Sequence, residues 1–186
     1  MRFLVRLRAP GVPREDLLQT VVAIAKTLGA DPRNPKWTSY GALELDVFTK
    51  TRDDFGLFVS AVGPLAPLEF ATDLNVSRPH KEEADLFSEA RELFNSERYW
   101  ECHEVLEGVW RSKQGQERRL LQGVILVCAA LVHHQKGNDD VAMGVLRRAA
   151  AQLDYPEGTY GGFDLARLRR SVSGMIGTGK FGAFSL

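Results

Sequence analysis

The chain has 186 residues, 44% of them hydrophobic, so it is long enough to bury one sizeable core or two small ones. Its 24 basic and 24 acidic side chains cancel, which excludes a global field that would draw the protein to nucleic acid or to an anionic membrane. Cysteine occurs twice, at Cys102 and Cys128, inside apolar helical patterns that are typical of reduced core thiols. We expect a soluble, cytoplasmic protein, because the opening segment lacks the apolar run of a signal peptide and no later segment could span a bilayer.

The first 77 residues predict alternating strands and helices. The expected elements are, in chain order, a strand (2–8), a helix (14–28), a loop with two prolines (31–36), extended segments (37–40 and 42–49), a short helix capped by Asp53 or Asp54 (to 62) and a strand (68–74). This order predicts a ferredoxin-like α/β sandwich. A simpler three-stranded unit is the alternative if Gly41 does not separate two strands.

Beyond the composition break at residues 77–80, every apolar run has helical spacing, so we place a domain boundary near residue 78. The expected helices cover residues 81–94, 99–111, 117–136, 139–153 and 164–176, with Asp164 as a helix cap after a glycine-rich turn at 156–162. The predicted fold class is therefore α+β: a ferredoxin-like domain at 1–77 followed by an all-α helical bundle at 78–186.

Residues 94–110 place one histidine, several acids and several aromatic side chains on a single short helix. At about 100° per residue, His103, Glu107 and Trp110 fall on one stripe with Tyr99, beside the face that should be buried. Buried ionisable groups cost free energy unless they are paired, hydrogen-bonded or bound to a metal. The pattern therefore predicts an inward-facing polar site on this helix.

A second histidine lies on the long helix at 117–136, where Gln122, Leu126, Ala129 and His133 share one face. If the two helices pack antiparallel, His103, Glu107, His133 and Gln122 meet in one layer of the bundle. Two imidazoles and a carboxylate suit one divalent transition metal, and an open coordination position would activate a water. Glu104 would then serve as a base or an extra ligand, with Glu101 a weaker candidate.

Two other readings of the same residues stay open. His103 and Glu107 can neutralise each other one helical turn apart, which makes the layer purely structural, or they can form a metal-free acid/base pocket. His134 lies about 100° from His133 around the helix, so the sequence does not decide which histidine faces the bundle.

Five arginines, at positions 147, 148, 167, 169 and 170, make the last third of the chain locally basic. Without a helix-turn-helix pattern or interleaved aromatic residues, this basic region does not favour nucleic-acid binding. The partner is therefore expected to be a small-molecule substrate or a protein, and a homo-oligomer is an open alternative.

The spacing of several motifs strongly resembles the family called domain of unknown function 309. The matching residues are Phe94-Asn95, Tyr99-Trp100-Glu101, His103-Glu104, Leu106-Glu107, Trp110, Leu121-Gln122-Gly123, the run from Ala129 to His133, and Gly137-Asn138. The resemblance covers about residues 80–153 and implies a compact helical bundle, with Glu101, His103, Glu104, Glu107, Gln122, His133 and Asn138 as the carried-over residues. It implies no activity, cofactor or substrate. The chain departs from the pattern at Gly108, which costs about 1 kcal/mol of helix propensity and indicates close helix contact.

Two functional hypotheses follow. The first is a small metal-dependent hydrolase, with His103, Glu107 and His133 as ligands, Glu104 in catalysis, and Gln122, Glu101, Asn138 and Trp110 in support. The second is a non-catalytic interaction or scaffold module whose His/Glu layer is structural.

Overall fold

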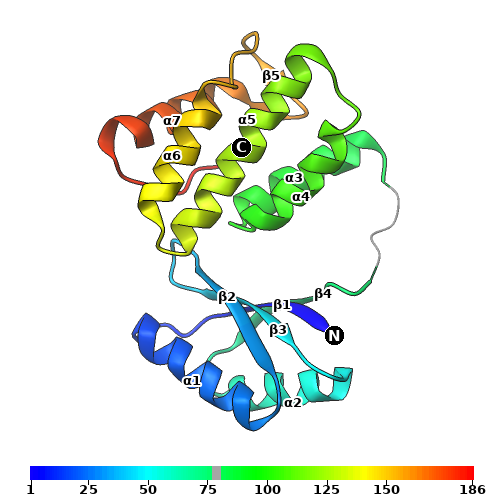
Figure 1. Cartoon of the computed structure of the whole chain (residues 1–186), viewed down its shortest axis with the longest axis vertical. Helices are drawn as coiled ribbons and strands as arrows, with labels where there is room; N and C mark the ends of the chain where they lie inside the picture. The colour runs from blue at the N-terminus through cyan, green and yellow to red at the C-terminus, as the bar shows by residue number, and fades with distance from the viewer. Residues whose placement is uncertain (77–80) are drawn as a thin grey trace. The chain divides into compact units, whose positions relative to one another are not determined.

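The computed structural model describes residues 1–76 and 81–186, and the chain forms two compact units, Met1–Pro79 and His80–Leu186 (Figure 1). We call them the sheet unit and the helical unit. The boundary predicted near residue 78, and His80 beside it, lie outside the described residues.

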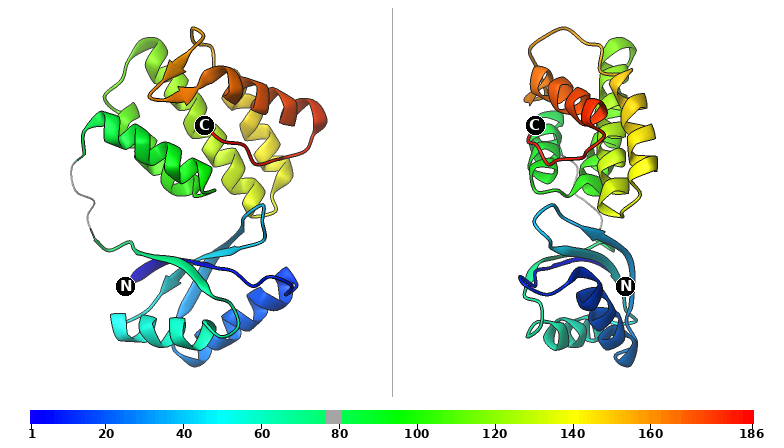
Figure 2. Two further views of the ribbon diagram at one scale, coloured as in Figure 1. Left: turned by 180° about the vertical axis from the view of Figure 1, so that it is seen from behind. Right: turned by 90° about the vertical axis from the view of Figure 1, so that its left-hand side faces the viewer.

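The sheet unit contains a four-stranded antiparallel sheet with both helices on one face (Figure 2). Its elements are β1 (Arg2–Leu7), α1 (Arg14–Thr27), β2 (Asp31–Trp37), β3 (Leu43–Phe48), α2 (Arg52–Val62) and β4 (Leu68–Asp73). The strand order across the sheet is β2-β3-β1-β4. Alternate residues of β1 and β3, such as Val5 and Leu45, are buried in a core shared with Val21 of α1 and Phe58 of α2. The predicted α+β class, with a sheet first and helices after it, is confirmed.

The predicted loop at 31–36 is wrong, because these residues form most of β2, and the strand predicted at 37–40 is replaced by a turn after Trp37. β2 lies at the edge of the sheet, so it bonds to β3 alone. Proline lacks a backbone N–H, and edge strands and bulges are where a sheet tolerates that loss. The register between β2 and β3 shifts between Arg33 and Lys36, where Asn34 has a φ of 53°. Pro35 lies within this bulge, whereas Pro32 pairs with Val47 and is tolerated because β2 is an edge strand.

The N-cap of α2 is Thr51 and not Asp53 or Asp54. The Thr51 hydroxyl accepts a hydrogen bond from the Asp54 backbone N–H (3.1 Å), and the Asp54 carboxylate accepts one from the Thr51 backbone N–H (2.9 Å). Asp54 therefore completes a capping box from inside the helix.

The other face of the sheet carries ion pairs that the sequence reading did not anticipate. Glu44 on β3 pairs with Arg6 on β1 (2.8 Å) and also with Lys36 on β2. Arg6 donates a second hydrogen bond to the Tyr40 hydroxyl (3.1 Å). Glu44 thus links three neighbouring strands through two cations.

The helical unit consists of α3 (Glu83–Asn95), α4 (Tyr99–Trp110), α5 (Gly115–Gln135), α6 (Asp139–Ala150) and α7 (Leu165–Thr178). All five predicted helices are confirmed within a few residues at each end. The long helix α5 packs against both α4 and α6 (Figures 1 and 2). Asp164 caps α7 as predicted, accepting a hydrogen bond from the Arg167 backbone N–H (2.9 Å). Within the described residues, no helix has the length and apolar character needed to cross a membrane.

A short hairpin, β5 (Thr159–Tyr160) and β6 (Phe163–Asp164), replaces the turn predicted at 156–162. Gly161 and Gly162 connect the strands with φ values of 57° and 82°, the left-handed region that a two-residue hairpin loop of this kind needs. A Cβ at Gly161 would lie 2.3 Å from Cδ1 of Phe87, so the glycine also lets the hairpin tip rest on α3.

Candidate functional site

Helix α4 has an inner face, which packs against the core, and an outer face, which is partly exposed to solvent. Its inner side chains are buried in the core and include Cys102, Leu106 and Val109. Its outer face carries residues at spacings of three and four: Trp100, His103, Glu104, Glu107 and, just after the helix, Arg111. We call these five residues the α4 outer stripe. His103 and Glu107 are half-buried and lie at the border between the two faces.

His103 contacts two other residues of the α4 outer stripe, Trp100 and Glu107. Its ring stacks on Trp100, with centroids 5.4 Å apart and planes 8° from parallel, and its Nε2 lies 3.4 Å from Oε1 of Glu107. The other carboxylate oxygen of Glu107 is 4.0 Å from the Arg111 guanidinium. Nδ1 of His103 is buried and has no hydrogen-bond partner among the described residues. The imidazole is therefore fixed from two sides, by a ring and by a carboxylate.

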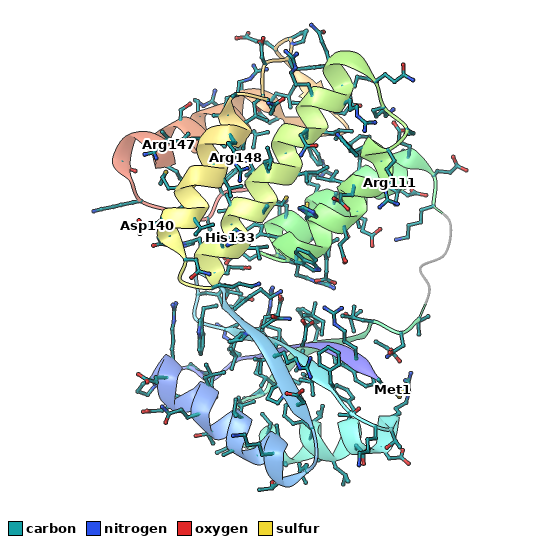
Figure 3. All side chains as sticks on the ribbon, in the orientation of Figure 1. Met1, Arg111, His133, Asp140, Arg147 and Arg148 are labelled. Carbon is teal, nitrogen blue, oxygen red and sulfur yellow. The ribbon has the colours of Figure 1, made fainter. Side chains whose placement is uncertain are left out.

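His133 does not join this group. Cys102 on α4 faces Cys128 on α5 with the sulfurs 3.5 Å apart, and Gln135 near the end of α5 donates to the Glu97 carbonyl just before α4 (2.9 Å). The helices are thus antiparallel, as predicted, and His103 is level with residue 127 of α5. At about 1.5 Å per residue, His133 lies about 9 Å further along the axis. Figure 3 shows it near the end of α5, where its Nδ1 is buried with no hydrogen-bond partner in the described part of the chain.

No three His, Cys, Asp or Glu side chains are grouped to hold a metal ion within residues 1–76 and 81–186. Donors around one zinc ion must each lie about 2.0 to 2.3 Å from it. The set of His103, Glu107 and His133 is not assembled for that purpose. The pair that the structure does bring together is His103 with Glu107.

The supporting residues have other partners. Glu101, the weaker ligand candidate, is buried and bonded to Arg98 in a two-point pair, one contact of which measures 2.7 Å. Gln122 is half-buried on α5. The guanidinium of Arg118 lies 3.6 Å over the Trp110 ring. Asn138 is the N-cap residue of α6 but makes no side-chain capping bond there.

His134, the alternative to His133, also has its own environment. Its Nδ1 lies 2.7 Å from Oδ1 of Asp139, and its ring stacks on Phe181 with centroids 4.6 Å apart. It therefore helps to hold the C-terminal segment against the bundle and does not face α4.

The two cysteines are buried core thiols, as predicted. The hydrogen bond with the Cys128 thiol, and after it burial, raise the pKa of Cys102 well above its ordinary value. A thiol held protonated in this way is a poor nucleophile.

Sequence reasoning missed a cavity beside the β5–β6 hairpin, which brings Lys113 and Glu117 close to Tyr160. The hairpin that forms one wall of this cavity could have been predicted from the sequence, because Tyr160-Gly161-Gly162-Phe163 is the pattern of a two-residue hairpin. Nothing in the spacing of Lys113 and Glu117 indicates that the hairpin lies next to them.

The proteins to which this chain is similar include two whose descriptions name no activity or ligand. An uncharacterized protein of Aquifex aeolicus (strain VF5) is 27% identical over 110 residues, which is 59% of this chain and 32% of that protein. This chain therefore spans about a third of the length of that relative. A crystal structure of a conserved hypothetical protein from Thermus thermophilus shows 38% identity over 49% of this chain and 95% of its own, with a TM-score of 0.43. The model of one protein family, described as "Domain of unknown function (DUF309)", matches residues 87–145, from α3 to α6.

Proposed function

We propose that this chain, which carries a domain of the DUF309 family at residues 87–145, uses its helical unit as a non-catalytic binding module. The partner is a protein, and the α4 outer stripe is the surface that takes it. The support comes from how the family-like motif residues divide between the core and the surface.

Most of the motif residues already have a packing role. Phe94 and Tyr99 are buried and make an edge-to-face ring contact with centroids 5.0 Å apart. Asn95 accepts a hydrogen bond from the backbone N–H of Leu186 (2.9 Å). A Cβ at Gly123 would lie 2.7 Å from Cδ2 of Leu153, so this glycine permits the close approach of the segment after α6. These residues are explained by the stability of the bundle alone.

Trp100, His103 and Glu107 are not explained in that way. Trp100 is 43% exposed, although tryptophan is large and mostly apolar. Its stacking on His103 restricts the ring before any partner arrives, which reduces the entropy that binding would cost. Tryptophan and arginine are the residues most enriched at the centres of protein interfaces. The exposed and pre-ordered Trp100 ring is the observation that carries the proposal.

The charges around Trp100 favour a protein over other partners. Glu104 and Glu107 place two carboxylates on the same helix face as Trp100, and these charges would repel nucleic acid and anionic lipid. Arg111 supplies the opposite charge at the end of the stripe. An aromatic anchor with charges of both signs at its rim matches the general composition of protein interfaces.

The metal-dependent hydrolase hypothesis requires His103, Glu107 and His133 around one ion, with Glu104 as base. The axial offset of His133 counts against that arrangement. For the sheet unit, we propose a ferredoxin-like sandwich, supported by its element order, its antiparallel pairing and its strand order β2-β3-β1-β4.

The experiment starts with in-cell cross-linking. A photo-reactive benzophenone amino acid replaces Glu104, and in a matched control it replaces Val141, which is 51% exposed on α6. We expect a specific adduct from position 104 only, identified by mass spectrometry. Equal labelling from both positions would refute the assignment of the surface.

The identified protein is then purified and titrated calorimetrically with the wild-type chain and with Trp100→Ala and Val141→Ala. A central tryptophan contributes about 2 kcal/mol or more on truncation, so Trp100→Ala should weaken binding about thirtyfold. Val141→Ala should leave it within about twofold. Circular dichroism checks that both variants are folded, and wild-type affinity in a folded Trp100→Ala variant would overturn the proposal.

A further inference from the structure

A second surface feature of the helical unit shares no residue with the α4 outer stripe. It is a cavity of about 360 Å³ between the start of α3, the α4–α5 loop, the start of α5 and the β5–β6 hairpin. The residues that matter for its chemistry are Glu83, Phe87, Lys113, Glu117, Tyr160 and Gly161. This volume is at the lower end of the range for small-molecule sites, and suits a ligand about as large as an aromatic amino acid.

The wall of the cavity is built by close aromatic packing. The Phe87 ring meets the Tyr160 ring edge-on, with centroids 5.4 Å apart and planes at 89°. On its other side Phe87 meets Phe163 in the same manner at 5.7 Å. Because Gly161 has no side chain, the hairpin tip can lie directly against Phe87. The cavity is therefore formed by packed elements of the fold and not by a loose loop.

The cavity contains two carboxylates and one ammonium group, so one carboxylate charge is not neutralised. Lys113 pairs with Glu83, with Nζ 2.6 Å from Oε1, and this hydrogen bond raises the pKa of Lys113. The two charges cancel locally. Glu117 is half-buried and forms no ion pair within the described ranges. The cavity consequently carries a net negative charge at Glu117.

The Tyr160 hydroxyl is a second polar group of the cavity, next to Glu117. Its oxygen is buried beside the Glu117 carboxylate, which accepts a weak hydrogen bond of non-ideal geometry from the hydroxyl. Burial, with Glu117 and Glu83 nearby, raises the pKa of Tyr160 to about 12. The phenol therefore stays protonated at neutral pH, and its oxygen lone pairs can accept hydrogen bonds. Those lone pairs accept no hydrogen bond from the residues described, so a ligand N–H can supply one.

We propose that this cavity binds a small organic ammonium ion with an apolar body. Its N–H groups donate to the Glu117 carboxylate and to the Tyr160 oxygen, and its apolar part packs against Phe87. An anionic ligand would meet the charge of Glu117 directly and is disfavoured. The site is independent of the proposed protein-binding function, because none of its residues belongs to the α4 outer stripe.

The test is a titration of the full chain, ¹⁵N-labelled, with 2-phenylethylammonium, followed by heteronuclear correlation spectra. The comparison ligand is 3-phenylpropionate, which has a similar shape and the opposite charge. We expect saturable shifts confined to residues 83–87, 112–118 and 158–163, and at least about tenfold weaker binding of the carboxylate. Equal affinity for the two ligands, shifts elsewhere, or no binding of the ammonium ion up to about 20 mM would overturn the proposal.

Two variants, Glu117→Gln and Tyr160→Phe, locate the binding groups, and Asp140→Asn is the control. Glu117→Gln removes the charge but keeps the shape, and should weaken ammonium binding at least about fivefold. Asp140→Asn removes an exposed charge on α6 (Figure 3), outside the cavity, and should leave the affinity unchanged. Tyr160→Phe removes only the hydroxyl and should weaken binding about threefold. If Glu117→Gln does not fold, the affinity of Tyr160→Phe for the ammonium ion is the deciding measurement. Wild-type affinity in folded Tyr160→Phe would refute the site.

Discussion

Substituting alanine at Gly108 should stabilise the helical unit. We expected close helix contact at this glycine, but a Cβ there would meet no described atom within 4 Å. The residue lies in the last turn of α4, has no positive φ, and is exposed. Alanine should therefore add helix propensity without a clash, stabilising by about 0.5 to 1 kcal/mol and raising the melting temperature by about 2 to 6 °C.

Gly123→Ala is the matched comparison, because this glycine also lies inside a helix. Alanine would gain about 1 kcal/mol of propensity there as well. Its Cβ, however, would lie 2.7 Å from Cδ2 of Leu153 and 3.2 Å from the backbone carbonyl carbon of Gln152. The Leu153 side chain can rotate, but the backbone carbon moves only with its whole segment. Overpacking of this kind costs about 1 to 3 kcal/mol, so the net change should be a loss of about 1 kcal/mol.

Urea denaturation followed at 222 nm measures both changes on the full chain. The reasoning requires opposite signs: Gly108→Ala above the wild type and Gly123→Ala below it. A destabilised Gly108→Ala would show that the outer face of α4 is covered at this point. A stabilised Gly123→Ala would show that the approach to Leu153 is looser than the structure indicates.

Three further predictions concern metal, charge and pH. Protein purified without chelator should contain far less than one equivalent of transition metal, and near-stoichiometric metal that disappears in His103→Ala would restore the hydrolase hypothesis. Glu44→Ala should destabilise the sheet unit by about 3 kcal/mol in chemical denaturation, because it leaves Arg6 and Lys36 without their shared carboxylate, and a loss below about 1 kcal/mol would contradict the buried network. The folded-state pKa of Tyr160 is raised to about 12 from 10.0, so its contribution to stability is complete below pH 10 and is lost as the pH rises toward 12. Melting temperatures should therefore fall less steeply between pH 9.5 and 11.5 in Tyr160→Phe than in the wild type, and identical slopes would refute this role.

The sequence predicted the helices better than the strands, for a physical reason. Each helix of the helical unit buries one continuous stripe, and that stripe leaves a period of 3.6 residues in the sequence. β2 leaves no such trace, because an edge strand with a bulge can hold Pro32 and Pro35 and expose much of its surface. The β5–β6 hairpin is only two residues on each side, too short for any period to be visible.

The candidate site was predicted in part. Helical spacing correctly placed His103 and Glu107 side by side, since residues four apart on a helix are neighbours. Helical spacing could not predict the axial register between α5 and α4. That register depends on contacts such as Cys102 with Cys128, which set the axial offset of His133. Spacing within one helix is local information, whereas the register between two helices is decided by the packing of the whole bundle.

The two proposed binding surfaces meet at the end of α4, which allows a test of whether they communicate. Lys113 of the cavity follows α4 by three residues, and Arg118 both covers the Trp110 ring and donates to the Lys113 carbonyl (3.2 Å). These contacts tie the loop to the helices on both sides. A loop held in one arrangement cannot transmit a change, because coupling requires an element with two arrangements that each ligand biases.

We therefore expect the protein partner to bind equally well, within about twofold, with and without saturating 2-phenylethylammonium. The measurement is the same calorimetric titration at two ammonium concentrations, with the Glu117→Gln variant as the control for effects outside the cavity. Because linkage is reciprocal, any larger change must appear equally in the affinity for the ammonium ion when the partner is present. A larger change in the wild type that vanishes in Glu117→Gln would show that the loop between α4 and α5 moves, and that the cavity regulates the α4 outer stripe.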